Sequence, residues 1–183
     1  TPGSTSPRQN EEGFTRIVPS ERTFSYVLCF EPRIEVTQSD VRAVQLAKAA
    51  LYAGARLLMD HYGVDHVDEI RLAGAFGSHI DPLYAMVLGM IPDCDLDRVS
   101  AAGNAAGVGA MMALLSGVAR DEIEATALAI EKVETAVEPR FQEHFVAALA
   151  IPHKTDGFPM LSAAIDLPSP TESRGRRGRR SGQ

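Results

Sequence analysis

Two glycine-rich turns are the part of this sequence best suited to hold a ligand. They comprise seven residues: Gly74, Ala75, Phe76, Gly77, Gly103, Asn104 and Gly107. Glycine has no Cβ, so a ligand can approach the backbone N–H groups, and a helix that follows adds positive potential at its N-terminus. Such turns suit a nucleotide, and two in succession favour a shared cleft. The same glycines could serve only the packing of strand against helix, so both interpretations stay open.

Other catalytic patterns are weak in this chain. The first turn is not a Walker A loop, because no Gly-Lys-Ser or Gly-Lys-Thr follows it, and it lacks the third glycine of the dinucleotide fingerprint. Ser78 and His79 are adjacent, and sequence neighbours rarely face each other, so no nucleophile and base pair is predicted. The histidines and aspartates of residues 61–68 lie in a polar connection, so no metal site is predicted. The catalytic residues remain unidentified.

The elements that position these turns begin with a strand pair and a long helix. Residues 24–30 and 34–36 are rich in β-formers, which predicts two strands joined by a turn. Thr37 and Asp40 have the spacing of a capping box, which predicts a helix start, and Gly63 ends that helix. Apolar or small residues at gaps of three and four predict the face that this helix turns toward a core: Val41, Val44, Ala47, Leu51, Ala55, Leu58 and Tyr62.

Strands and helices then alternate. Short strands are predicted at residues 70–73 and 99–102, and they precede helices that start at Asp81-Pro82 and Ala105. Three more elements are predicted downstream: a helix at residues 120–132, a strand at 133–135 and a helix starting at Pro139. This alternation favours an α/β fold.

Composition narrows the class of protein. The 183 residues are 45% hydrophobic and 23% charged, as in a soluble globular protein. Cys29 and Cys94 have no Cys-x-x-Cys spacing, which excludes an iron-sulfur or zinc cluster within this chain and favours a cytoplasmic location. No apolar run is long enough to cross a membrane. The first residue is Thr rather than Met, so a piece of a longer protein is expected.

The charge is unevenly distributed. The last 13 residues carry five arginines and one glutamate, a local charge of +4. Since the whole chain has a net charge of −6, the first 170 residues sum to −10. An acidic body argues against nucleic acid as the principal partner. The Gly-, Ser- and Arg-rich tail has nothing to bury and is predicted to be disordered.

Several motifs, in the same order, resemble the C-terminal part of the reductive activators of corrinoid-dependent proteins. They are Thr-Gln-Ser-Asp-Val-Arg at 37–42, Gln-Leu-Ala-Lys-Ala-Ala at 45–50, Leu-Ala-Gly-Ala-Phe-Gly at 72–77, Gly-Asn-Ala-Ala at 103–106 and Phe-Gln-Glu-His-Phe at 141–145. The resemblance covers residues 24–152. It implies half of an actin-like, ribonuclease H-like ATPase fold of the acetate and sugar kinase, heat-shock chaperone and actin (ASKHA) superfamily, with a short mixed sheet flanked by helices.

The resemblance also implies a domain organisation and a site. Residues 1–22 are expected to be a linker or truncated edge, 23–152 the C-terminal ASKHA-type lobe and 153–183 the disordered Arg-rich tail. By motif, the turn at residues 74–77 corresponds to the adenosine-side loop, and Gly103, Asn104 and Gly107 to the second wall of the ATP cleft. ATP with magnesium is the implied cofactor, and a 2Fe-2S cluster is implied only for a ferredoxin domain that precedes this part.

The implied function is ATP-dependent reduction of a cobalt(II) corrinoid to cobalt(I) on a methyltransferase-system protein. The partners would be that corrinoid protein and the missing N-terminal half of the same fold, with a homodimer left open and with neither nucleic acid nor membrane involved. This chain alone is expected to be inactive, because it has no counterpart of the first half of the ATPase fold. A small-molecule kinase half of the same superfamily and a non-catalytic interaction lobe are the alternatives.

Overall fold

A three-stranded antiparallel sheet opens the chain. The computed structural model describes residues 16–20 and 23–167, in which β1 (Ile17–Ser20), β2 (Thr23–Phe30) and β3 (Arg33–Val36) pair in that order. The predicted strand pair is confirmed as β2 and β3. Strand β1 lies within the stretch predicted to be a linker, residues 1–22, and corrects that boundary: Ile17 and Val18 pair with Tyr26 and Ser25 of β2.

A single long helix connects this sheet to the rest of the molecule. Helix α1 (Gln38–Tyr62) starts at the predicted capping box, in which the Asp40 N–H donates to Thr37 Oγ1 at 3.2 Å and the Thr37 N–H donates to Asp40 Oδ2 at 2.8 Å. The Thr37 N–H and the Thr37 hydroxyl both donate to the Asp40 carboxylate, and these two hydrogen bonds lower the pKa of that carboxyl. The helix ends at Gly63, whose φ of 69° is left-handed. Both predicted ends are confirmed.

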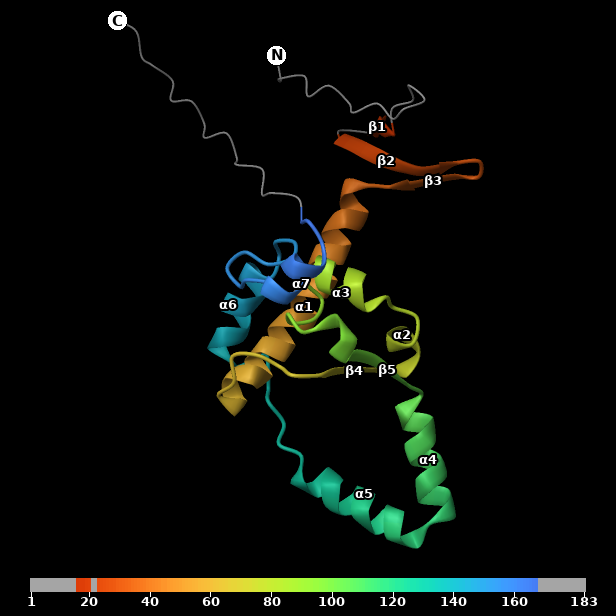
Figure 1. Cartoon of the computed structure of the whole chain (residues 1–183), viewed down its shortest axis with the longest axis vertical. Coiled ribbons are helices and arrows are strands. Elements are labelled where there is room, and N and C mark those ends of the chain that lie inside the picture. The colour runs from red at the N-terminus through yellow and green to blue at the C-terminus, as the bar shows by residue number, and fades with distance from the viewer. Residues whose placement is uncertain (1–15, 21–22, 168–183) are drawn as a thin grey trace, which may run out of the picture.

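The predicted core face of α1 is wrong. Most side chains of the predicted stripe are exposed, with Leu51 at 53% and Tyr62 at 83%, and Ala55 is half-buried. The buried face is instead formed by Lys48, Ala49, Tyr52, Ala53, Leu57 and Met59. The reason is tertiary, because the C-terminal part of the chain folds back and packs on this other side of the helix (Figure 1).

A second, parallel sheet follows α1. It consists of β4 (Ile70–Ala73) and β5 (Val99–Gly103), close to the predicted bounds, so parallel and antiparallel strands are divided between two small sheets. Between them lie the short helix α2 (Gly74–Gly77), the helix α3 (Pro82–Leu88) and the 3-10 turn η1 (Leu96–Arg98). Helix α3 begins as predicted, with Asp81 accepting from the N–H of Leu83 at 2.8 Å and proline at its first position.

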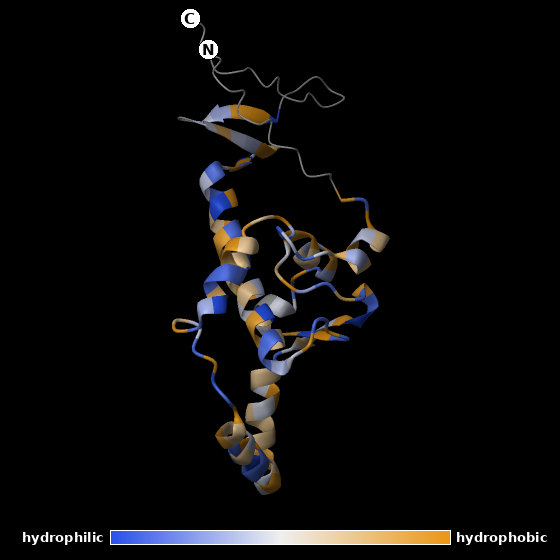
Figure 2. Cartoon of the chain, turned by 90° about the vertical axis from the view of Figure 1, so that its left-hand side faces the viewer, coloured by the Kyte–Doolittle hydropathy of each residue, from blue (hydrophilic) through white to orange (hydrophobic). Residues whose placement is uncertain are grey.

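Helices α4 (Ala105–Leu115) and α5 (Gly117–Ala129) form a hairpin that projects from the body (Figure 1). Helix α4 buries no residue in the described chain, and Figure 2 shows it in predominantly hydrophobic colours. The helix predicted at 120–132 begins earlier, because the Ser116 hydroxyl accepts from the Ala119 N–H at 3.2 Å and caps α5. Residues 133–135 form no strand, since no described strand lies beside them to supply hydrogen bonds.

The chain returns to α1 through α6 (Pro139–Ala147), which starts at the predicted proline. Asp60 of α1 holds it: its carboxylate accepts from Arg140 at 2.8 Å and lies 2.6 Å from His144 Nε2. Helix α7 (Pro159–Ala164) then packs near α3. It corrects the tail predicted at 153–183, because Phe158 and Leu161 are buried in the core. The Arg-rich part of that predicted tail, residues 168–183, lies outside the described residues.

The core lies between α1, α3, β5 and α7. It is built from Ala49, Tyr52, Met86, Cys94, Val99, Ala148, Phe158 and Leu161. Burial of these apolar side chains holds the C-terminal segments on the helix, at roughly 25 cal/mol for each Å² removed from water. No helix in the described ranges is long and apolar enough to span a bilayer.

Candidate nucleotide site

The two predicted glycine turns lie side by side. Strands β4 and β5 run parallel, and their last residues, Ala73 and Gly103, are partners in the ladder. Gly74 continues directly from β4, and Asn104 continues from β5. The carboxyl ends of parallel strands are where α/β sheets bind ligands, because the connections diverge there and leave a crevice. The structure therefore brings the two turns together at one edge of the parallel sheet.

Among the glycines of the two turns, Gly74 and Gly103 are the ones with open space beside the backbone. Gly74 has a φ of 89° and Gly103 a φ of 63°, a conformation that residues with a Cβ adopt only with strain. A Cβ built on either residue would meet no heavy atom within 4 Å. Space for a ligand against the main chain therefore exists at both turns.

Gly77 has a different environment. A Cβ there would lie 2.7 Å from both the carbonyl carbon and the carbonyl oxygen of Leu72, and 2.9 Å from the Leu72 Cβ. Helix α2 thus lies directly on β4, and only glycine permits this approach. Packing is enough to explain glycine at this position.

Asn104 and Gly107 are joined by a helix cap. The side-chain oxygen of Asn104 accepts from the Gly107 N–H at 2.9 Å, at the N-terminus of α4. A Cβ on Gly107 would approach Nδ2 of Asn104 to 2.5 Å, so the cap itself favours glycine. The first backbone N–H groups of α4 remain directed outward next to the β5 turn, as at any helix start.

The residues after the first turn fold back on α2. Ser78 Oγ donates to the Gly74 carbonyl at 3.0 Å, and His79 Nδ1 lies 2.8 Å from the Ala75 carbonyl oxygen. Both side chains thus contact carbonyl groups of α2. Ala75 is exposed, and the backbone of Phe76 lies within α2.

A polar cluster that the sequence patterns did not indicate ties the C-terminal segment to α1. Buried Lys48 donates from Nζ to the carbonyls of Ala150 and Pro152, and Tyr52 donates to Asp156 Oδ2 at 2.8 Å. Burial lowers the pKa of Lys48 to about 8 and, together with the bond to Asp156, raises the pKa of Tyr52. The spacing of Lys48, Tyr52 and Arg56 by four residues was a signal of one polar helix face.

His153 completes this cluster. Its Nδ1 accepts the N–H of Asp156 at 2.9 Å, while its buried Nε2 has no partner among the described residues. The ring lies 4.7 Å from that of Tyr52, and burial lowers the pKa of His153, so the neutral form with the proton on Nε2 fits this environment. The cluster holds the segment of residues 149–156 on α1 and thereby supports the core behind the glycine turns.

The arrangement supplies binding groups rather than reacting groups. The two open turns offer backbone donors and a helix start, but no acid, base or nucleophile within them. No group of three or more histidine, cysteine or acidic side chains able to hold a metal is found in the described ranges. The geometry therefore suits a ligand with polar and anionic groups that is held by the main chain.

Comparison with known proteins gives this site its context. Residues 4–162 match the profile of a family described as the C-terminal domain of RACo, the ASKHA domain. Over 115 residues the chain is 42% identical to the corrinoid activation enzyme RamQ of Eubacterium limosum. This aligned stretch covers 62% of this chain and 19% of that protein. A solved structure of a reductive activator for corrinoid, iron-sulfur protein matches with a TM-score of 0.66 at 32% identity, covering 79% of this chain and 24% of that one. The chain spans about a fifth to a quarter of these relatives.

Proposed function

Because this chain belongs to the family of the C-terminal ASKHA domain of RACo, we propose that it forms one wall of an ATP site in a reductive activator of corrinoid proteins. The observation that carries the proposal is the juxtaposition of two open glycine turns at the carboxyl ends of β4 and β5. Relatives named for corrinoid activation supply the chemical context.

In this proposal ATP lies against the backbone of Gly74 and Gly103. Both residues have room where a Cβ would be, so a flat adenosine group can approach the main chain closely. The start of α4, fixed by the cap between Asn104 and Gly107, follows directly after Gly103, and its N-terminal end favours negative charge. Gly77 contributes by seating α2 on β4, which sets the position of Gly74 relative to Gly103.

In the longer protein, the activity would be ATP-dependent electron transfer. One electron passes from a 2Fe-2S cluster, which becomes oxidised, to a cobalt(II) corrinoid, which becomes cobalt(I). A ferredoxin potential of about −400 mV is insufficient for this couple, so ATP must supply the additional free energy. ATP binding and electron transfer would be coupled if the corrinoid protein bound the nucleotide-bound activator more tightly than the nucleotide-free one. Equal affinity for these two forms would shift no equilibrium.

We place this reaction in the cytoplasm, where free thiols such as Cys29 and Cys94 stay reduced. The isolated chain should not hydrolyse ATP, since it carries only one side of the cleft. Steady-state phosphate release from the purified chain tests this point, and turnover at the rate of a complete relative would contradict it.

Nucleotide binding tests the site directly. In the full-length polypeptide, Gly74→Ala and Gly103→Ala should each weaken ATP affinity at least about tenfold, measured by calorimetry, which corresponds to about 1.4 kcal/mol. Gly63→Ala is the matched control: it has a φ of 69° and open space around its Cβ, so it carries the same backbone strain at the end of α1. Equal loss of affinity in all three variants would refute the site.

The whole reaction has its own test. Full-length protein, reduced anaerobically, is mixed with a candidate corrinoid protein, and the visible spectrum is followed with and without ATP. Cobalt(I) should accumulate only when ATP and magnesium are present. Equal accumulation without ATP would remove the nucleotide from the mechanism and would favour a role as an interaction lobe.

A further inference from the structure

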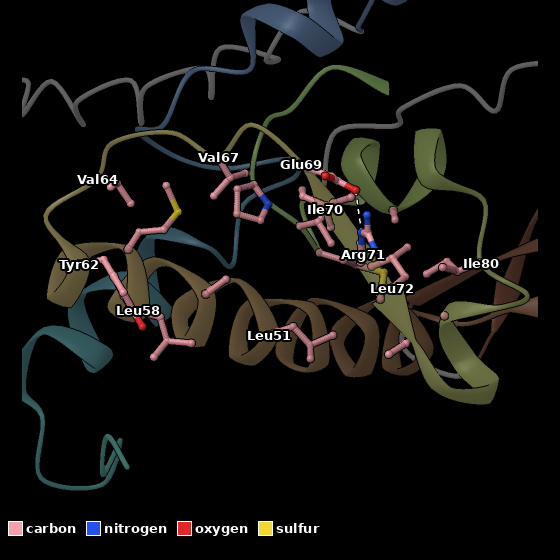
Figure 3. A pocket seen from close by; sticks show the side chains of 18 residues that line it. Leu51, Leu58, Tyr62, Val64, Val67, Glu69, Ile70, Arg71, Leu72 and Ile80 are labelled. Carbon is pink, nitrogen blue, oxygen red and sulfur yellow. Dashed lines mark hydrogen bonds and ion pairs between the residues drawn. The ribbon is translucent and has the colours of Figure 1, made fainter. Parts of the chain in front are cut away.

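Residues 149–156, which we call the strap, lie along one face of α1 and are held there by polar groups. Another face of the helix borders an apolar cavity of about 600 Å³, to which Leu51 and Leu58 contribute (Figure 3). The charged residues at that cavity, Glu69 and Arg71, pair with each other at 2.7 Å, and none of the described histidines lines it. Histidine is the side chain that titrates near neutral pH, so this cavity offers α1 no proton-sensitive contact there.

His153 organises the last turn of the strap. Its Nδ1 accepts the backbone N–H of Asp156 at 2.9 Å and that of Thr155 at 3.3 Å. A nitrogen that accepts carries no proton, so the proton of the neutral ring is on Nε2. That nitrogen is buried and has no hydrogen-bond partner among the described residues. Since the side chain is only 2% exposed, the ring is enclosed by the protein in its neutral form.

Protonation of this ring conflicts with the turn that holds it. The added proton has to go to Nδ1, where it would point at the N–H groups of Thr155 and Asp156. Donors that face each other form no hydrogen bond, so both N–H groups would lose their acceptor. Asp156 also brings a carboxylate beside the ring: its Oδ1 lies 3.6 Å from Nδ1, while its Oδ2 accepts from the Tyr52 hydroxyl at 2.8 Å. A charged His153 would therefore draw this carboxylate away from α1.

The surroundings of His153 also disfavour a positive charge. The titratable groups that face it are Asp156 of the same turn, Lys48, Tyr52 and Arg56 of α1, and His144 of α6. Burial lowers the pKa of His153 most, the carboxylate raises it, and the three basic neighbours lower it further. Lys48 is fixed beside the strap, because its Nζ donates to the carbonyls of Ala150 and Pro152. A second positive charge at this place meets repulsion.

We propose that His153 is a proton-sensitive latch, which holds the strap on α1 while the ring is neutral and releases it when Nδ1 takes up a proton. The end of the strap at Asp156 opens first, because its bond to Tyr52 depends directly on this turn. The bonds from Gln45 and Lys48 to the other end follow. The proposal goes beyond the proposed function, since it concerns the attachment of the C-terminal segment and requires no nucleotide.

Acid opens the latch. The pKa of His153 in the closed form is lowered from the 6.5 of the free side chain, so the open form binds a proton that the closed form excludes. The latch is therefore fully closed above pH 6.5 and weakens as the pH falls below this value. One proton changes the ratio of closed to open forms by at most about tenfold for each pH unit. Lys48, whose pKa is about 8, keeps its charge in this range.

Hydrogen exchange of the full-length polypeptide, followed by mass spectrometry at pH 7.5 and 5.5, tests the latch. After correction for the intrinsic effect of pH on exchange, the protection of the amides of residues 154–156 should fall about tenfold at pH 5.5. Peptides covering β4 and β5 should keep their protection and so report that the protein is folded. His153→Asn should abolish the fall, because the asparagine oxygen can accept the same N–H groups and takes up no proton.

His144→Gln is the matched control. The His144 ring is 2.6 Å from the Asp60 carboxylate, and glutamine keeps a donor for that carboxylate while removing a second histidine near the strap. The fall in protection should persist in this variant. A measurement on the natural polypeptide makes the test independent of how either variant folds: the pH profile for exchange of the His153 C2 hydrogen should have its midpoint below 6.5.

Three results would overturn the proposal. The first is equal protection of residues 154–156 at both pH values in the natural polypeptide, which would mean that a proton does not open the turn. The second is a fall that persists in His153→Asn or disappears in His144→Gln, which would assign the response to another group. The third is a C2 midpoint at or above 6.5. None of these measurements requires ATP, so failure here and failure of the proposed function can be told apart.

Discussion

Gly77→Ala should destabilise the chain substantially, although the substitution adds a single methyl group. The new Cβ would lie 2.7 Å from the carbonyl carbon and oxygen of Leu72. Carbon atoms in contact are normally about 3.5–4.0 Å apart, so the overlap approaches 1 Å. The obstacle is the backbone of β4 rather than a side chain that can turn away. Relief therefore requires α2 to move off the sheet, at a cost of about 1–3 kcal/mol, the range typical of overpacking.

Urea denaturation followed by circular dichroism measures this effect. With a slope of about 2 kcal/mol per molar urea, the midpoint of Gly77→Ala should fall by about 0.5–1.5 M. Gly54→Ala is the control: Gly54 is in the middle of α1, and a Cβ there meets nothing within 4 Å. This control should gain up to about 1 kcal/mol from helix propensity. If both variants unfold at the same midpoint, the packing explanation of Gly77 is wrong.

Three further perturbations test the supports of the site. Asn104→Ala removes the acceptor of the Gly107 N–H and should cost about 0.5–2 kcal/mol in urea denaturation, while Asn104→Asp, which keeps an acceptor, should cost less. Asp93→Ala leaves the N–H groups of Met160 and Leu161 without their carboxylate acceptor, and faster proteolysis between residues 157 and 167 should reveal the release of α7. Burial lowers the pKa of Lys48 from 10.5 to about 8, so the folded state loses this proton before the unfolded state does, and the unfolding free energy should rise by at most about 3 kcal/mol as the pH increases from 8 to 10.5. Lys48→Met should abolish that rise, and an unchanged pH profile in this variant would show that Lys48 is not its source.

Most local features of this protein follow from its sequence. The capping box of Thr37 and Asp40, the left-handed Gly63 and the Asp81-Pro82 start are short-range signals, and each marks a helix end in the structure. The β-rich runs became strands wherever a partner strand was available. The predicted strand at 133–135 failed for that reason, because a strand's hydrogen bonds depend on a neighbour that the local sequence does not specify.

Which face of a helix is buried depends on contacts with distant parts of the chain. The apolar periodicity of α1 correctly indicates an amphipathic helix, yet Lys48 is buried and Leu51 exposed, because carbonyls at Ala150 and Pro152 satisfy the lysine within the fold. The strand at Ile17–Ser20 and the helix at Pro159–Ala164 were missed because each is stabilised by a distant segment rather than by its own pattern.

The two glycine turns, their order and the family to which they belong can be recognised from residue types alone. Residue type alone does not distinguish an open glycine from a packed one, since Gly74 and Gly77 differ in backbone φ and in what surrounds them only in the folded structure. The parallel pairing of β4 and β5 made that distinction, by placing Gly74 beside Gly103 with free space around both and pressing Gly77 onto the Leu72 backbone. A glycine allows either a ligand or another chain segment to approach its backbone. Which of the two occurs depends on how close segments remote in sequence lie in the folded protein.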